Sequence, residues 1–208
     1  MRVTLRPFLL SVFLILAGLA GPLSASAQYT WKPEKIKDGI QVYLSQVKGS
    51  SYKAVRVECT LAGTYDKLIS LLTNVGNFHN WIYHNKQSKL LKQNSRMDFI
   101  YYSETQMPVP FANRDVIIRL QLKTDSLPRF MTIEGFHQKD FLPDLPGRAR
   151  IPYYKASWKV TMPSPSTIHI DYILEVDPGG SLPAWLANSF AEKGPLGTFQ
   201  NLAKELKK

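Results

Sequence analysis

The chain has 208 residues, of which 44% are hydrophobic, and its formal net charge is +10. This length suits one globular domain with a sizeable core, and the single cysteine, Cys59, excludes an internal disulfide. The positive charge favours an anionic lipid surface over nucleic acid as a partner, or it serves solubility alone.

The N-terminal segment has the pattern of a secretory signal peptide. Basic residues precede an apolar run from Phe8 to Ala20, and Ala25-Ser26-Ala27 supplies the small residues that a signal peptidase requires. The run is shorter than the ~20 residues that span a bilayer, which disfavours the alternative of an uncleaved anchor. We therefore expect a signal peptide at 1–27, a single domain at 28–208, and a periplasmic or secreted protein.

Short apolar runs separated by turn residues follow along the chain. Tyr52 to Leu61 alternates and places Val55, Val57, Cys59 and Leu61 on one face, and Asp66 to Leu72 has helical spacing. Further strands rich in Ile, Val, Tyr and Phe are expected at 96–106, 114–123, 130–136, 150–162 and 167–176. Because no long helices are interleaved with these runs, an antiparallel sheet fits better than a parallel doubly wound one.

The last predicted element is a long amphipathic helix over Leu182 to Leu206. Gly179 and Gly180 allow a sharp exit from the preceding strand, and Ser181 is the expected N-cap. Gly194-Pro195 should kink or interrupt the helix, since proline cannot donate to the preceding turn. The apolar face of the helix must lie across the sheet because no other layer can bury it. Periodicity does not decide whether the helix seals a solid core or a cavity.

Three short motifs occur in order along the chain: "DGIQVY" at residues 38–43, "MPVPFANRD" at 107–115 and "DPGGSLPAWLAN" at 177–188. Together they resemble the START, or StAR-related lipid-transfer, domain, and most closely its phosphatidylcholine transfer branch. The resemblance covers nearly all of residues 31–206. It implies an α+β helix-grip fold, in which a curved antiparallel sheet wraps around a long C-terminal helix and leaves an internal hydrophobic tunnel for one lipid. On this resemblance, Trp185 lies in the roof over the ligand.

Strand parity points to one charged residue on the apolar side of the sheet. Arg114 shares its parity with Val116, Ile118 and Leu120, whereas Asp115 falls on the opposite side. A buried guanidinium needs an acceptor, and Glu104 is the nearest candidate in sequence. The pair Glu104–Arg114 is then either part of a head-group site or a structural link between two strands.

Neither head-group set of the family carries over to this sequence. The phosphatidylcholine branch flanks a tryptophan equivalent to Trp81 with an arginine and an aspartate, where this chain has Phe78 and Ile82. Among the positions that contact choline, only Tyr154 keeps an aromatic ring, and the second arginine of the sterol-binding branch is replaced by Leu120. We expect an apolar pocket that suits a lipid with a small head group, a fatty acyl chain or a polycyclic isoprenoid. The candidate ligand-binding residues are Arg114, Glu104, Phe78, Trp81, Ile82, Val116, Ile118, Leu120, Tyr154, Trp158 and Trp185.

The stretch Lys139 to Arg148, "KDFLPDLPGR", corresponds to a loop that covers the tunnel mouth in the family. Phe141, Leu142 and Leu145 stand among prolines and a glycine that cannot continue a strand. We expect a lid that opens first and brings these apolar side chains to a membrane. The alternative is a loop whose apolar residues fold back onto the sheet.

The sequence carries no catalytic, cofactor or metal motif. His79 and His84 are five positions apart, but no cluster of carboxylates or cysteines completes a metal set. A nucleophile elbow, a phosphate-binding glycine loop and a zinc-protease helix motif are also missing from the sequence. The expected protein is a monomeric carrier without cofactor, which moves one lipid between membranes or to a partner. The alternatives are an enzyme of the wider helix-grip superfamily that acts on a hydrophobic small molecule, and a periplasmic lipid sensor.

Overall fold

The computed structural model describes residues 29–50, 52–124, 126 and 128–208, and the predicted signal peptide at 1–27 lies outside them. In chain order the elements are β1 (Lys32–Lys37), β2 (Ile40–Gln46), β3 (Lys53–Ala62), α1 (Tyr65–Thr73), the 3-10 helix η1 (Val75–Asn80), β4 (Asn85–Ser95), β5 (Asp98–Thr105), β6 (Asn113–Lys123), β7 (Met131–His137), β8 (Arg148–Arg150), β9 (Tyr153–Ser164), β10 (Thr167–Asp177) and α2 (Ala184–Glu205). Among the helices of these ranges, none has the length and apolar character needed to cross a membrane.

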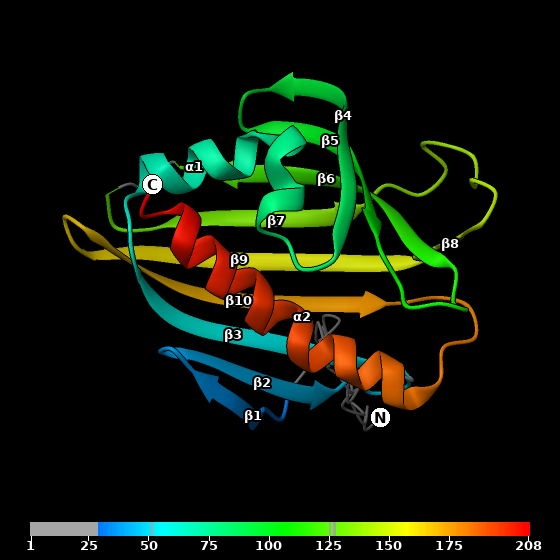
Figure 1. The fold of residues 1–208 in the computed structure, drawn as a ribbon. Helices are drawn as coiled ribbons and strands as arrows, with labels where there is room; N and C mark the ends of the chain where they lie inside the picture. Colours follow the sequence, from blue (N-terminus) through cyan, green and yellow to red (C-terminus); the bar gives the residue numbers. More distant parts are fainter. Residues whose placement is uncertain (1–28, 51, 125, 127) are drawn as a thin grey trace, which may run out of the picture.

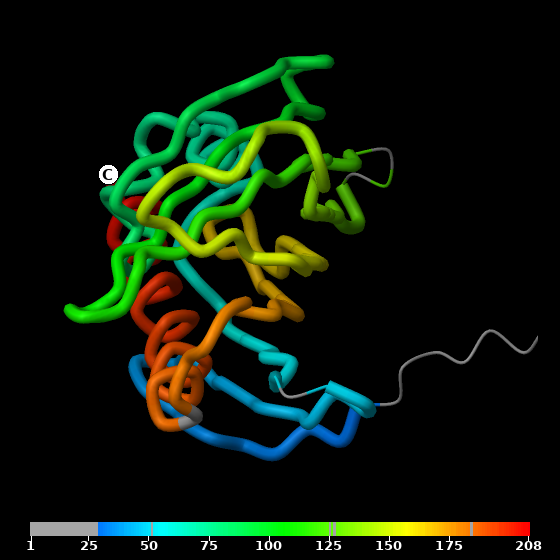
Figure 2. Tube along the Cα trace, turned by 90° about the vertical axis from the view of Figure 1, so that its right-hand side faces the viewer, coloured from blue at the N-terminus to red at the C-terminus, as the bar shows by residue number. Residues whose placement is uncertain are grey.

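The strands of the described chain form one curved sheet in the order β1-β2-β3-β10-β9-β7-β6-β5-β4, with β8 beside β6. Neighbouring strands are antiparallel, except that β8 runs parallel to β6. Helix α2 crosses one face of this sheet (Figure 1), and Figure 2 shows from the side how the strands curl around the helix. The predicted helix-grip architecture is therefore confirmed.

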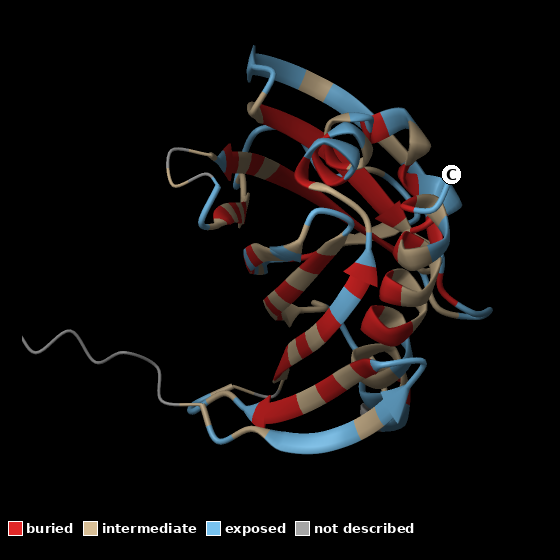
Figure 3. Ribbon diagram, turned by 90° about the vertical axis from the view of Figure 1, so that its left-hand side faces the viewer, coloured by how far each residue is buried: buried red, intermediate tan, exposed pale blue. Residues whose placement is uncertain are grey.

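The strands predicted between residues 52 and 176 are present, with ends that shift by at most three residues. The predicted face of Val55, Val57, Cys59 and Leu61 is buried, and burial raises the pKa of the Cys59 thiol to about 12. Strands β1, β2, β4 and the three-residue β8 were not predicted. The edge strands β1 and β4 are mostly exposed (Figure 3), so their sequences need no apolar alternation. Strand β2 does alternate, and the same rule could have found it.

Two details predicted for the C-terminal helix are wrong. Ser181 is not the N-cap, because the helix begins at Ala184 after Pro183, and the cap makes no side-chain hydrogen bond. Of the kink or interruption predicted at Gly194-Pro195, the interruption is wrong, since Pro195 lies inside one continuous helix. Tertiary packing explains the second difference: Pro195, Leu196 and Phe199 are buried, and this burial offsets the missing hydrogen bond.

A ring from another segment packs closely on this part of α2. A Cβ placed on Gly197 would lie 2.6 Å from Cδ2 of Tyr83, and one on Gly194 would lie 3.8 Å from Cδ1. The Tyr83 N–H donates to Thr198 Oγ1 at 3.1 Å. The two glycines therefore belong to a contact surface for Tyr83 rather than to a break in the helix.

The two halves of α2 meet different surroundings. Near its C-terminal end, Leu202 and Leu206 are buried in the same core as Leu68 of helix α1, and Leu206 reaches to within 3.1 Å of a Cβ built on Gly63. This half of the helix seals a solid core. The N-terminal half, by contrast, covers a cavity.

The segment between β7 and β8 packs on the opposite face of the sheet. Ile100, Tyr102 and Ile117 form a second buried cluster there, and Leu142 and Leu145 pack against it. The prediction that Lys139 to Arg148 forms a lid over the tunnel mouth is therefore wrong. The apolar residues fold back onto the sheet, which was the alternative, and Phe141 remains 38% exposed.

Two buried carboxylates hold this segment in place. Asp115, 1% exposed, binds Arg150 through both of its oxygens at 3.0 Å, and Arg150 also donates to the carbonyls of Leu142 and Pro143. Glu104, which has no exposed surface, forms an ion pair with Arg148 at 3.0 Å. Arginines of the segment thus neutralise charges that the sheet would otherwise bury alone.

We predict that Arg150→Met destabilises the protein strongly, because it leaves the Asp115 carboxylate buried without its partner. The expected cost is about 3 kcal/mol of unfolding free energy, which corresponds to a fall in melting temperature of roughly 6–12 °C for a domain of this size. Lys123→Met is the control, since the Lys123–Glu134 ion pair lies at the surface and should change the free energy of unfolding by less than about 1 kcal/mol. Equal effects of the two substitutions in thermal melts would contradict the prediction.

Because of Glu104, the free energy of unfolding should fall as the pH becomes acidic. Burial alone would raise the pKa of this carboxyl, but hydrogen bonds from Gln87, Asn113, Arg148 and Lys86 outweigh it and lower the pKa from 4.5 to about 2. Because the folded-state pKa lies below the unfolded value, the stabilisation is complete above the unfolded pKa and is lost as the pH falls from about 4.5 to 2.

The substitution Glu104→Gln should therefore lower the free energy of unfolding at pH 7, and the difference from the natural protein should shrink as the pH falls toward 2. Urea unfolding at a series of pH values measures this difference. A difference that stays constant across the range would show that the Glu104 carboxylate is not stabilised by its hydrogen bonds.

Candidate functional site

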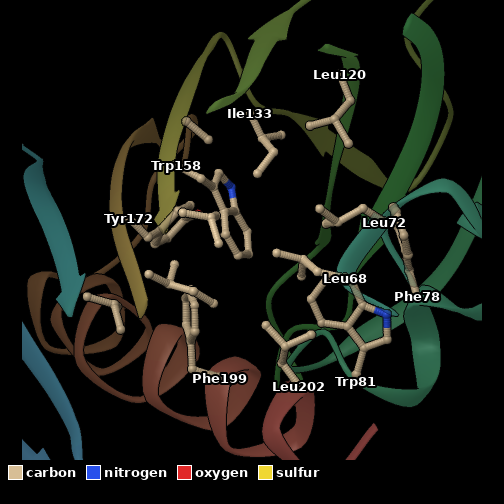
Figure 4. Close-up of a cluster of buried hydrophobic side chains, with 14 of the residues drawn as sticks. Leu68, Leu72, Phe78, Trp81, Leu120, Ile133, Trp158, Tyr172, Phe199 and Leu202 are labelled. Carbon is tan, nitrogen blue, oxygen red and sulfur yellow. The ribbon is translucent and has the colours of Figure 1, made fainter. Parts of the chain in front are cut away.

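An internal cavity of about 440 Å³ lies between the sheet and helix α2, which lines it as far as Phe199. Figure 4 shows the ring of side chains in this part of the core, with Leu120, Trp158 and Tyr172 from the sheet facing Phe199 of α2. The rings of Trp158, Tyr172 and Phe199 pack against one another in tilted pairs, with centroids 4.8–5.3 Å apart. These three rings close the space between sheet and helix beside the solid half of the core.

Most of the predicted ligand-binding residues line this cavity. The period-2 parity of β6 places Arg114, Val116, Ile118 and Leu120 on the cavity side, as predicted. The predicted residues that the structure brings together are Phe78, Trp81, Ile82, Arg114, Val116, Ile118, Leu120, Tyr154 and Trp158. Two predicted residues, Glu104 and Trp185, do not line it.

The predicted pairing of Arg114 with Glu104 is wrong. In the β5–β6 register Arg114 stands opposite Thr105, whereas Glu104 stands opposite Asp115. Cross-strand partners share a face, so Glu104 and Arg114 point to opposite sides of the sheet. Arg114 donates instead to backbone carbonyls, those of Ala112, Pro178 and Gly179. The nine residues between the two charged groups, 105–113, include the turn that sets this register, and the sequence does not show how that turn aligns the strands.

Trp185 does not form a roof over the cavity. Its side chain is 65% exposed, and its ring lies 6.5 Å from that of Phe111, measured between centroids. The residues that α2 turns to the cavity are spaced by about one helical turn, and Trp185 is not among them; they are Ala187, Asn188, Phe190, Ala191, Gly194, Pro195, Thr198 and Phe199. The apolar face of the helix is thus rotated away from the position that the resemblance implied.

Tyrosines supply hydroxyl groups to a largely apolar wall, and two of them were not predicted. Tyr101 and Tyr172 line the cavity together with Tyr154. Burial raises the pKa of Tyr101 and Tyr172 well above 10 and that of Tyr154 to about 12, so the three phenols stay protonated near neutral pH. Strand alternation could have found both, because Tyr101 shares its parity with the buried Phe99 and Tyr172 with the buried Ile170.

A glycine inside strand β7 gives the ring of Tyr154 its place. Gly135 pairs with Leu120 on one side and with Ala156 on the other. A Cβ on Gly135 would lie 3.3 Å from Cε1 of Tyr154. The ring therefore lies across the bare backbone of β7, and a side chain at position 135 would push it into the cavity.

Exposed apolar side chains gather at one end of the cavity. The β5–β6 connection and the β10–α2 connection supply Met107 and Leu182 to the cavity wall. The β5–β6 connection also carries Val109, 94% exposed, and Phe111, while Trp185 follows the β10–α2 connection in the first turn of α2. We call Val109, Phe111 and Trp185 the mouth patch.

Comparison with known proteins identifies one relative by sequence and several solved structures with a similar fold. No family model matches the chain. Protein PA1579 of Pseudomonas aeruginosa, itself uncharacterized, is 32% identical over 202 residues, which cover 96% of this chain and 98% of PA1579. The crystal structure of a STAR-related lipid transfer protein fragment from Xanthomonas axonopodis is 29% identical, with a TM-score of 0.77, and the match covers 86% of this chain and 99% of that one.

Human STARD10 is 17% identical, with a TM-score of 0.73, and the match covers 86% of this chain and 73% of that one. At this sequence identity, the match to the human structure shows the fold alone. The match to the Xanthomonas protein agrees with the curved antiparallel sheet and the long C-terminal helix described above. The chain therefore belongs to one family with PA1579 of Pseudomonas aeruginosa and has the fold of the START, or StAR-related lipid transfer, domain.

Proposed function

We propose that the protein binds one hydrophobic molecule in its cavity and carries it between membranes or to a partner protein. The observation that carries this proposal is the cavity itself, about 440 Å³ in volume and lined mainly by aliphatic and aromatic side chains. Its volume lies toward the lower end of the ~300–1,000 Å³ typical of small-molecule sites. A single-chain lipid or a compact polycyclic molecule suits it better than a large two-chain lipid.

The predicted export of the protein bears on where it would act. The signal-peptide pattern at 1–27 favours a periplasmic or secreted carrier, which would meet the outer surfaces of membranes. The net charge of +10 on the whole chain is compatible with anionic lipid surfaces.

The mouth patch is the surface through which the carrier would meet a membrane. Val109 and Trp185 hold large apolar areas in contact with water, and burying each in a bilayer would gain ~1.5–3 kcal/mol. The patch borders the cavity through Met107 and Leu182, so a molecule could pass between bilayer and cavity without crossing water. This role was expected of the segment at 139–148, which instead lies on the other face of the sheet.

We expect the purified protein, expressed in bacteria, to carry about one hydrophobic molecule per chain and to release it chemically unchanged. Native mass spectrometry measures the occupancy, and lipid analysis of an extract identifies the molecule. Transfer between donor and acceptor vesicles should be faster with the protein than without it. An empty protein that accelerates the transfer of no lipid class would refute the carrier function, and conversion of the bound molecule would favour the enzyme alternative.

The double substitution Val109→Asp and Trp185→Asp should abolish binding to anionic vesicles and slow transfer at least about tenfold. Both side chains are largely exposed, so the melting temperature should change little. Ile36→Asp is the matched control, because Ile36 is 68% exposed on edge strand β1 and should leave vesicle binding intact. Normal vesicle binding by the double variant would show that membranes are met through another surface.

A further inference from the structure

The wall of the cavity contains a positively charged side chain that has no acidic partner among the described residues. Arg114 is only 5% exposed, and among the described residues no carboxylate lies within ion-pair distance of it. Its three hydrogen bonds go to neutral carbonyls: Nε to Pro178 and Nη2 to Gly179, both at 3.2 Å, and Nη1 to Ala112 at 2.5 Å. Burial lowers the pKa of this guanidinium, but an arginine stays charged at physiological pH. A buried charge of this kind is stabilised by an anion.

The hydrogen bonds of Arg114 leave two donors for such an anion. A guanidinium has five N–H groups, one on Nε and two on each terminal nitrogen. The three bonds within the described chain use the Nε donor and one on each terminal nitrogen, so Nη1 and Nη2 each keep one N–H. Gly180 keeps the space beside them open, because a Cβ at this position would lie 3.5 Å from Nη2. Two N–H groups on adjacent nitrogens match the two oxygens of a carboxylate.

The other charged residues of the cavity wall determine the charge of the ligand that fits. Apart from Arg114, the wall contains Lys53 and Asp177. Asp177 accepts a hydrogen bond from the Gly179 N–H at 2.9 Å and forms no ion pair with Arg114. Lys53 and Asp177 carry opposite charges, so the wall as a whole has one positive charge. A ligand with a single negative charge would neutralise it, whereas a dianionic phosphate monoester would leave an excess.

We propose that the natural ligand is a hydrophobic carboxylic acid whose carboxylate binds Nη1 and Nη2 of Arg114. This proposal rests on the proposed function, since it specifies the ligand class of the same cavity. Arg114 is held by carbonyls of the β5–β6 and β10–α2 connections; the first of these carries Val109 and Phe111 of the mouth patch, and the second leads directly into Trp185. The carboxylate therefore lies near the mouth, and the apolar body of the ligand extends toward Trp158, Tyr172 and Phe199.

Matched single-chain ligands test the proposal on the unaltered protein. Hexadecanoic acid, hexadecanol, hexadecyltrimethylammonium and hexadecyl phosphate are each titrated at pH 7.5 against a fluorescent apolar probe bound in the cavity of delipidated protein. The acid should bind at least about tenfold more tightly than the alcohol, because only the acid forms charge-assisted hydrogen bonds. The ammonium compound should bind most weakly. Equal affinities for acid and alcohol, or tighter binding of the phosphate than of the acid, would overturn the carboxylate assignment.

Two arginine substitutions give the second arm of the test. Arg114→Gln should bring the ratio of acid to alcohol affinity to about one while binding of the alcohol persists. Arg96→Gln removes the same charge from an exposed position and should keep the ratio of the natural protein. A preserved ratio in the Arg114 variant would overturn the proposal. If Arg114→Gln does not fold, the ratio measured on the natural protein decides. Failure of all four ligands to displace the probe would instead count against the proposed function.

Discussion

The apolar face of helix α2 can be buried only against the concave face of one sheet, and the rest of the structure depends on this constraint. The sheet curves around the helix, so both can bury their apolar sides without a third layer (Figure 2). The contact is uneven along the helix. Around Leu202 and Leu206 the helix meets α1 and packs solidly, while around Ala191 and Thr198 it stands over a cavity. The same burial that holds the fold together thus encloses the candidate binding site.

The charged side chains on the two faces of strand β6 have different kinds of partner. On the outer face, Asp115 is paired with Arg150, and the neighbouring Glu104 is paired with Arg148. These pairs fasten the segment before β9 to the sheet. On the cavity face, the partners of Arg114 within the described part of the chain are three backbone carbonyls. A buried charged side chain that forms an ion pair within the protein has a structural role. A buried charged side chain without such a partner indicates a ligand-binding site.

Sequence reasoning succeeded where a local pattern corresponds to a buried surface. Alternation in β3 and β6 identified which side chains face the core, and Arg114, Val116 and Ile118 were placed on the cavity side for this reason. It failed at Glu104, because parity within one strand says nothing about the register between two strands. It also failed for residues 139–148, since a mixture of prolines and apolar residues does not specify which face of the sheet receives them.

The sequence by itself determined the antiparallel strands, the long C-terminal helix and the resemblance that indicated the fold, because these follow from hydrophobic periodicity and short motifs along the chain. Only the tertiary structure decided the register of β5 on β6, the rotation of α2 that leaves Trp185 outside, and the isolation of the Arg114 charge. Each of these depends on contacts between segments far apart in sequence, such as Arg114 with the carbonyls of Pro178 and Gly179. Burial and charge neutralisation are properties of the assembled packing, and no local pattern encodes them.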